Sequence, residues 1–199
     1  MNMGVTSLDK WESMWAPYDA ELYAEVLQQI APDDHVLDIG AGDLRLGLQL
    51  ARRSAKVYAL EINWRLLQQA AKHLPANLNL LVGDARFLPF PKDVTTAVLL
   101  MRHCTHFSLY FDKLRATNCR TLLTNARWGL GLEVVDLRAA RPMFEALDMG
   151  WYACRCGHAG FKSGPPQFLD ERNIDLVSET DSCPVCQAAR GYAGVSAFR

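Results

Sequence analysis

Hydrophobic residues recur along the chain with two different periods. Between residues 17 and 32 they lie three or four positions apart, which predicts a helix with one apolar face, formed by Leu22, Tyr23, Val26, Leu27 and Ile30 and ended by Pro32. Two later segments, DLRLGLQLARR (43–53) and NWRLLQQAAKHL (63–74), also predict helices, although the leucines of the first alternate as in a strand. Short apolar runs predict five buried strands: DHVLDIG (34–40), KVYALE (56–61), LNLLVGD (78–84), TTAVLLM (95–101) and CRTLLTN (119–125).

Strands that alternate with helices predict an α/β fold with a doubly wound, mostly parallel sheet. Residues 132–147 predict a further helix, kinked or divided at Pro142. Beyond Met149 the helical period disappears, and glycine, proline and cysteine become frequent. We therefore divide the chain into residues 1–149 and 150–199. The second part is expected to be a small metal-bound lobe or the last hairpin of the same sheet.

A glycine pair follows the first predicted strand. Ligands of open parallel sheets bind beyond the carboxyl ends of the strands, and Gly40 and Gly42 fall at such an end. Two glycines let the backbone turn tightly and approach a ligand closely. A dinucleotide-binding loop has the spacing G-x-G-x-x-G, whereas Arg45 occupies its last position here. The spacing therefore argues against a nicotinamide-binding oxidoreductase, the alternative reading of this turn.

Carboxylates follow the first three predicted strands in turn. Asp38 precedes the glycine turn, Glu61 ends the second strand, and Asp84 follows the third. Parallel strands would bring these acids to one edge of the sheet, where they would repel a polyphosphate. They suit a ligand that carries an ammonium group, a ribose diol and an adenine amine. S-adenosylmethionine has all three groups.

VLDIGAGDLRLG, LEIN and GDARFLPFP resemble the first three motifs of class I S-adenosylmethionine-dependent methyltransferases, over roughly residues 17–128. The resemblance implies that the turn passes beneath the methionine part of the cofactor, while Asp38 supports the turn and the amino group. It also implies that Glu61 accepts hydrogen bonds from the ribose and Asp84 from adenine N6. The implied cofactor-binding set is Asp38, Gly40, Ala41, Gly42, Glu61, Ile62, Asp84, Ala85 and Met101. Leu44 departs from the family, because many members have a third glycine there.

The segment LLMRHCTHF follows the fourth predicted strand, where this family faces the reactive methyl group. Adenine amino methyltransferases commonly resemble D/N-P-P-Y/F there, and this chain does not. His103 and His106 are the candidate general bases. Alternatively, His103 packs under the sheet and His106 caps the next helix, and Cys104 is a less favoured nucleophile. The segment WESMWAPYD (11–19) is expected to form a lid over the cofactor or a hydrophobic staple onto the core.

Two close cysteine pairs lie near the end of the chain, in CRCGH and CPVC. Both resemble the knuckles of zinc ribbons and rubredoxin-like sites. Four thiolates suit a closed, structural zinc site. Cys154, Cys156, Cys183 and Cys186 are the predicted ligands, with iron in the same cage, His158 as a substitute ligand, disulfides and free thiols as alternatives.

Charge and hydropathy narrow the functional classes further. The 199 residues carry a net charge of -1, which argues against a protein that coats nucleic acid or an acidic membrane. We expect a cytoplasmic protein, because the sequence shows no signal peptide or membrane span. Residues 102–141 hold seven basic and three acidic residues beside the expected acceptor site, although solvated helix faces explain this equally. The sequence thus predicts an S-adenosylmethionine-dependent methyltransferase with a zinc site, acting on a small molecule or RNA. The alternative is a non-catalytic interaction module of the same fold.

Overall fold

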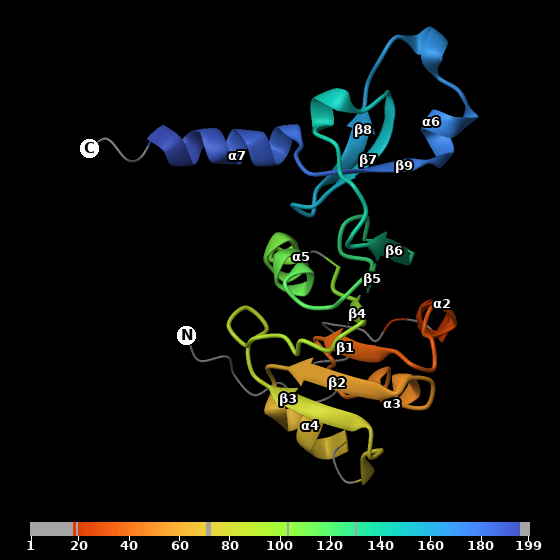
Figure 1. The fold of residues 1–199 in the computed structure, drawn as a ribbon, viewed down its shortest axis with the longest axis vertical. Coiled ribbons are helices and arrows are strands. Elements are labelled where there is room, and N and C mark those ends of the chain that lie inside the picture. The colour runs from red at the N-terminus through yellow and green to blue at the C-terminus, as the bar shows by residue number, and fades with distance from the viewer. Residues whose placement is uncertain (1–17, 19, 71–72, 103, 130, 196–199) are drawn as a thin grey trace.

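The structure is a computed structural model that describes residue 18 and residues 20–70, 73–102, 104–129 and 131–195. Its larger sheet has six strands in the order β3-β2-β1-β4-β5-β6 (Figure 1). The strands are β1 (His35–Ile39), β2 (Lys56–Glu61), β3 (Leu78–Val82), β4 (Thr96–Leu99), β5 (Thr121–Thr124) and β6 (Glu133–Asp136). The first five are parallel, and β6 pairs antiparallel with β5. The predicted mostly parallel α/β sheet is therefore confirmed.

Helices cover both faces of this sheet. They are α2 (Ala20–Gln28), α3 (Gly47–Leu50), α4 (Trp64–Ala70) and α5 (Phe107–Arg115). Alternate residues of a strand point to opposite faces, so Leu37 of β1 joins the apolar cluster under α5, whereas Val36 joins the cluster under α2, α3 and α4. No helix lies between β3 and β4, and a loop over residues 83–95 connects them. Within the described residues, no helix has the length and apolar character needed to cross a membrane.

The helix predicted over residues 132–147 is wrong. Glu133–Asp136 form β6, and only Phe144–Ala146 adopt a short 3-10 helix, η2. Val134 is exposed whereas Val135 is buried, which is the two-residue period of a strand. β-Branched residues favour strands, and β6 supplies hydrogen-bond partners to the otherwise open edge of β5.

The C-terminal lobe, residues 150–195, contains a separate sheet and not a last hairpin of the first one. Its strands are β7 (Gly150–Cys154), β8 (Ala159–Lys162) and β9 (Val177–Thr180), in the order β8-β7-β9 (Figure 1). Short helices η3 (Pro166–Phe168) and α6 (Glu171–Asp175) precede β9, and α7 (Pro184–Val195) follows it. The division of the chain at Met149 stays a prediction. Pro142, which precedes this boundary, already contacts the lobe, because its carbonyl accepts a hydrogen bond from Thr180 Oγ1 at 2.7 Å.

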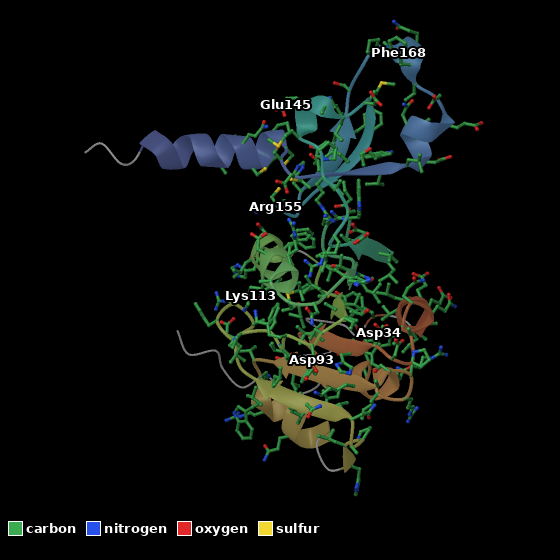
Figure 2. The ribbon with its side chains drawn as sticks, viewed as in Figure 1. Asp34, Asp93, Lys113, Glu145, Arg155 and Phe168 are labelled. Atoms are coloured by element: carbon green, nitrogen blue, oxygen red, sulfur yellow. The ribbon has the colours of Figure 1, made fainter. Side chains whose placement is uncertain are left out.

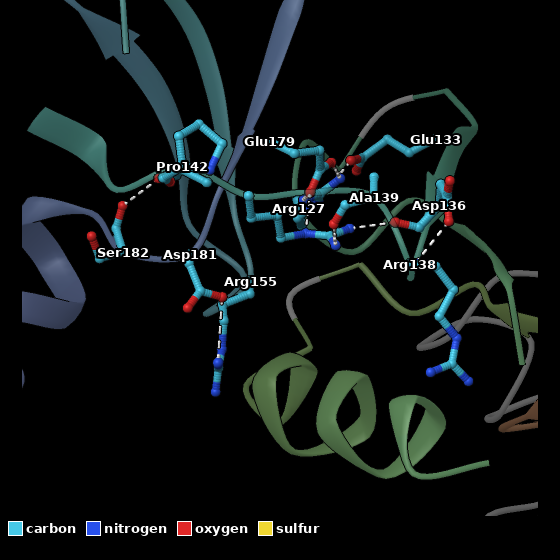
Figure 3. A network of polar contacts seen from close by, with 12 residues as sticks. Arg127, Glu133, Asp136, Arg138, Ala139, Pro142, Arg155, Glu179, Asp181 and Ser182 are labelled. Atoms are coloured by element: carbon cyan, nitrogen blue, oxygen red, sulfur yellow. Dashed lines mark hydrogen bonds and ion pairs between the residues drawn. The ribbon is translucent and has the colours of Figure 1, made fainter. Parts of the chain in front are cut away.

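A buried ion-pair network joins the lobe to the larger sheet (Figure 3). Arg127, which follows β5, pairs with Glu133 at 2.8 Å and with Glu179 of β9 at 2.6 Å. Arg141 Nε also pairs with Glu179, at 3.2 Å. The side chains of Arg127 and Arg141 are only 2% and 3% exposed. Two of the basic residues counted in the middle region therefore hold the fold together and do not face a phosphate.

Candidate active site and metal centre

The turn after β1 is built from left-handed backbone positions. Gly40 has φ +82° and Gly42 has φ +55°. The Gly40 N–H donates to the Leu60 carbonyl of β2 at 2.8 Å. A Cβ atom on Gly40 would lie 3.1 Å from Met101 Cε, so the turn also contacts the segment after β4. Glycine at these positions allows the backbone conformation and the close approach.

Glu61 closes the turn from the end of β2. Its carboxylate accepts hydrogen bonds from the Gly42 N–H at 2.9 Å and from the Asn63 N–H at 2.8 Å. The side chain is buried, at 8% exposure. A carboxylate offers about four acceptor sites, so two remain for hydroxyl donors of a ligand.

Asp38 lies on the same face of the sheet as Glu61. It is 4% exposed, and its Oδ2 atom has no hydrogen-bond partner among the described residues. Burial raises the pKa of Asp38 to about 7, with a further contribution from the Glu61 charge. A buried oxygen without a partner is costly, so a donor supplied by a ligand would be stabilising here.

Asp84 follows β3 and is held by Arg86. Arg86 Nη2 pairs with Asp84 Oδ2 at 2.5 Å, and the Arg86 N–H donates to Oδ1 at 2.9 Å. These bonds lower the pKa of Asp84 to about 2, so the carboxylate stays ionised. Apolar side chains stand exposed nearby in the sequence, with Ile62 at 53%, Trp64 at 51% and Phe87 at 81%. Ala85 is buried.

The acceptor-side segment runs from Met101 to His106, between β4 and α5. His103 lies outside the described residues. His106 is exposed and occupies the N-cap position of α5, as the alternative predicted, but its side chain makes no capping hydrogen bond. The centre of the His106 ring lies 6.3 Å from the centre of the Tyr110 ring. Burial raises the pKa of the Cys104 thiol, which disfavours the nucleophilic thiolate.

The described part of the N-terminal segment reaches this same region. The Tyr18 hydroxyl accepts a hydrogen bond from the Arg102 N–H at 3.2 Å, and the Arg102 guanidinium lies 4.9 Å from the centre of the Tyr18 ring. Trp11 and Trp15 lie outside the described residues. The lid therefore stays a prediction, with Tyr18 as its one described aromatic residue.

The four clustered cysteines bring their sulfur atoms within 4.8 Å of one another. Three of the sulfur–sulfur distances are 3.9 Å (Cys154–Cys186), 3.6 Å (Cys156–Cys183) and 3.8 Å (Cys183–Cys186). A tetrahedron with metal–sulfur bonds of about 2.3 Å has edges of about 3.8 Å. Sulfur atoms in a disulfide lie about 2.05 Å apart, so these distances fit a tetrahedral metal cage.

The surroundings of the sulfur atoms also fit a metal centre. The Cys183 N–H donates to Cys186 Sγ at 3.2 Å, which stabilises negative charge on that sulfur. A hydrogen bond from the Cys154 thiol lowers the pKa of Cys156 to about 5. His158 lies outside the cluster, with Nδ1 3.3 Å from the Tyr152 hydroxyl oxygen. The donor set is therefore four thiols, a set that suits zinc or iron.

Comparison with known families agrees with the methyltransferase resemblance of the segment that forms the larger sheet. Residues 36–124 match the family described as "Methyltransferase domain". The chain contains an S-adenosylmethionine-dependent methyltransferase domain. The match runs from the second residue of β1 to the last residue of β5, so it includes the glycine turn and all three strand-end acids.

Individual relatives share parts of this methyltransferase domain. The chain is 38% identical over 66 residues to the probable ribosomal RNA small subunit methyltransferase A of Methanosarcina mazei, which covers 32% of this chain and 24% of that protein. It therefore spans about a quarter of that relative's length. A dimethyladenosine transferase from Plasmodium falciparum is similar in structure, with 22% identity, a TM-score of 0.47, and coverage of 53% of this chain and 41% of the other. The 23S rRNA methyltransferase ErmE gives 23% identity, a TM-score of 0.46, and coverage of 54% and 46%.

The methyltransferase domain also contains residues that the sequence patterns did not reveal. Asn125 follows β5 at the carboxyl edge, is 1% exposed, and has an Oδ1 atom without a described partner. Trp64 and Phe87 follow the two outer strand-end acids and are exposed there. Phe87 could have been predicted from the sequence as a site residue, because an aromatic residue closely follows the acidic residue in GDARF. Asn125 gave none, because a single amide at the end of a strand is common.

Proposed function

We propose that this chain transfers the methyl group of S-adenosylmethionine to an acceptor at the carboxyl edge of the larger sheet. The observation that carries the proposal is the closure of Glu61 on the glycine turn, beside the unpartnered buried oxygen of Asp38. Both lie within the segment that matches the methyltransferase family. The arrangement offers acceptors for hydroxyl and ammonium donors next to backbone that a ligand can approach.

Each predicted residue has a proposed part in holding the cofactor. Asp38 would receive the amino group, Glu61 the ribose hydroxyls, and Asp84 the adenine amine. The backbone of Gly40, Ala41 and Gly42 would lie beneath the methionine part. Ile62, Ala85 and Met101 would form the apolar walls. When bound, the cofactor supplies an electrophilic methyl group on its sulfonium.

The residues after β4 would act on the acceptor. Methyl transfer needs an in-line approach of the nucleophile and, for a neutral nucleophile, removal of its proton. His106 is exposed at the N-terminus of α5, at the end of the acceptor-side segment that begins at Met101, and is a proposed base for that proton. His103 is the other proposed base. Cys104 is less suited, because burial keeps its thiol protonated.

Cofactor binding tests the proposal directly. Calorimetry with S-adenosylhomocysteine is expected to give heat with the wild-type chain and about tenfold or weaker binding for Glu61→Gln, since hydrogen bonds to a charged group contribute about 1.5–3 kcal/mol. Asp93→Asn is the matched control. Asp93 pairs with Lys56 at the start of β2 and with His35 at the start of β1, the opposite edge of the sheet. Absence of binding by the wild-type chain would contradict the proposal.

RNA is the acceptor class that we propose to test first, because the archaeal relative is named a ribosomal RNA methyltransferase. Tritiated S-adenosylmethionine is incubated with RNA, protein and small-molecule fractions of a cell extract. Label in RNA that declines as salt rises would support RNA, since phosphate contacts are salt-sensitive. Label only in small molecules would exclude it. Cofactor binding without transfer to any fraction would favour the non-catalytic module.

We further propose that Cys154, Cys156, Cys183 and Cys186 hold a structural zinc ion, with iron as the alternative in the same cage. The proposal is supported by sulfur–sulfur distances of 3.6–3.9 Å. Elemental analysis of the purified chain is expected to give about one metal ion per chain. Cys183→Ser should lose it, whereas Cys104→Ser, a thiol outside the cluster, should retain it. A cytoplasmic location stays a prediction from the sequence.

A further inference from the structure

The first cysteine knuckle packs against Phe107, the residue that directly follows the acceptor-side segment. The first knuckle, residues 154–158, turns through Gly157, whose N–H donates to the Cys154 carbonyl at 2.9 Å. Gly157 has φ +98°, and a Cβ atom placed on it would lie 3.0 Å from Cβ of Phe107. Glycine is therefore favoured both by the backbone conformation and by the neighbouring residue.

Phe107 is the first residue of α5 and directly follows the acceptor-side segment. It is 1% exposed, and the Arg127 guanidinium lies 5.5 Å from the centre of its ring. Gly157 thus packs against a residue already fixed by the core. At the other end of the segment, Met101 Cε approaches the glycine turn. The acceptor-side segment therefore begins at a residue that approaches the cofactor turn, and the residue that directly follows it packs against the first knuckle.

Arg155 gives the knuckle a second link to α5. Its side chain pairs with Asp112 of α5 at 3.2 Å and with Asp181, just before the second cysteine pair, at 3.4 Å. Figure 2 labels Arg155 at the side of the lobe that faces α5, and Figure 3 shows its pairing with Asp181. One side chain between two thiols therefore connects α5 to both cysteine pairs.

We propose that the first knuckle is a positioning element for methyl transfer. By packing on Phe107, Gly157 holds the acceptor-side segment against the cofactor turn, and the metal cage fixes the shape of the knuckle. Gly157 and Arg155 are positioning residues, since they act through Phe107 and Asp112. This inference rests on the proposed function and the proposed metal site.

Hydrogen exchange of the full chain tests the proposal. The Cys104 N–H donates to the Met101 carbonyl and the Tyr110 N–H to the His106 carbonyl, both at 3.1 Å, so these amides report the order of the segment. In Gly157→Ala we expect them to exchange at least about tenfold faster, with unchanged amides in β1 and unchanged metal content. Chelator treatment of the wild-type chain should have the same effect. Gly131→Ala is the control, because Gly131 has φ +66° but a Cβ there would contact nothing within 4 Å.

Arg155→Met is the second test variant, for the case in which Gly157→Ala loses its metal. It removes the ion pair with Asp112 and adds no atom beside the thiols. Faster exchange at Cys104 and Tyr110 with metal retained would support the proposal. Equal exchange in metal-loaded, metal-free and Arg155→Met protein would overturn it, as would an equal effect of Gly131→Ala. Cofactor binding is measured separately by calorimetry. Unchanged exchange with intact binding refutes the positioning role alone, whereas absent binding refutes the proposed function.

Discussion

The six-stranded sheet buries apolar side chains on both of its faces, whereas the three-stranded sheet of the lobe covers a single small cluster. The larger clusters include Leu37 and Phe111 under α5, and Val26 and Leu50 on the opposite face. The cluster at the lobe has four buried members: Leu147, which precedes the lobe, and Tyr152, Cys154 and Cys183 within it. Two of those four are proposed metal ligands. Small lobes with so little apolar burial usually need a metal, disulfides or a partner to fold.

This contrast divides the forces that stabilise the chain. Apolar burial is the main force that stabilises the methyltransferase domain. The free energy gained is proportional to the apolar area removed from water, and this domain contains the two large apolar clusters. The lobe has buried ion pairs to the larger sheet and the four clustered thiols of the proposed metal site. Changes that remove metal or charge should therefore act on the lobe first. Changes to packing or to buried acids should act on the larger sheet.

Metal removal is expected to have the largest effect. Structural zinc sites contribute about 10–16 kcal/mol of apparent binding free energy in small domains, so Cys154→Ala or a chelator should unfold the lobe. Amides of β7 and β9 should then exchange freely while those of β1 and β2 stay protected. Cys119→Ser, a buried thiol outside the cage, should leave the lobe folded. A lobe that keeps its protection without metal would show that its own packing suffices.

The buried ion pairs come next. Arg127→Met leaves Glu133 and Glu179 without their main partner, and breaking a buried pair from one side costs about 3–5 kcal/mol. Urea unfolding followed by tryptophan fluorescence should show an earlier transition, because Trp128 and Trp151 meet across this interface with ring centres 5.6 Å apart. Lys56→Met is the comparison, since it breaks an exposed pair with Asp93 that solvent screens. Equal effects of the two variants would argue against a buried anchor.

Local patterns predicted more of the larger sheet than of the lobe, for a physical reason. Parallel strands and amphipathic helices repeat a period, so β1 to β5 were predictable from runs such as KVYALE. The glycine turn and Glu61 were predictable as neighbours, because parallel strands end at one edge of a sheet. The Arg127–Glu179 pair joins residues 52 positions apart, and no local period encodes such a contact. The pattern of residues 132–147 predicts a helix where β6 forms, because the four residues of β6 are too few to distinguish the period of a strand from that of a helix.

Protonation of Asp38 provides a test confined to the larger sheet. Its folded pKa of about 7 lies above the ordinary value near 4, so the folded chain binds more protons than the unfolded chain between these values. Stability should therefore be greatest at the acidic end of this window and fall as the pH rises through 7. Asp38→Asn removes that loss. At pH 8 it should be more stable than the wild-type chain by about 2–4 kcal/mol, measured by urea unfolding at pH 5 and pH 8.

The same experiment separates stability from binding at Asp38. The variant is expected to bind S-adenosylhomocysteine more weakly despite its greater stability, because it lacks the charge that would receive an amino group. Loss of the lobe's protection in Asp38→Asn would contradict the division between the two regions. An identical dependence of stability on pH in both proteins would show that Asp38 does not carry this charge penalty.

The smallest expected effect concerns strain in the turn of the methyltransferase domain. Leu44 is fully buried but has φ +68°, a left-handed conformation that costs a residue with Cβ about 1–2 kcal/mol. Both truncations lose its apolar contacts, but Leu44→Gly also relieves the strain. We therefore expect Leu44→Gly to be more stable than Leu44→Ala by about 1 kcal/mol. Leu50, equally buried on α3, should show the reverse order, because glycine is disfavoured in a helix. Urea unfolding of the four variants measures these differences. The same order of stability at both positions would show that backbone strain at Leu44 does not explain why many members of the family have a glycine there.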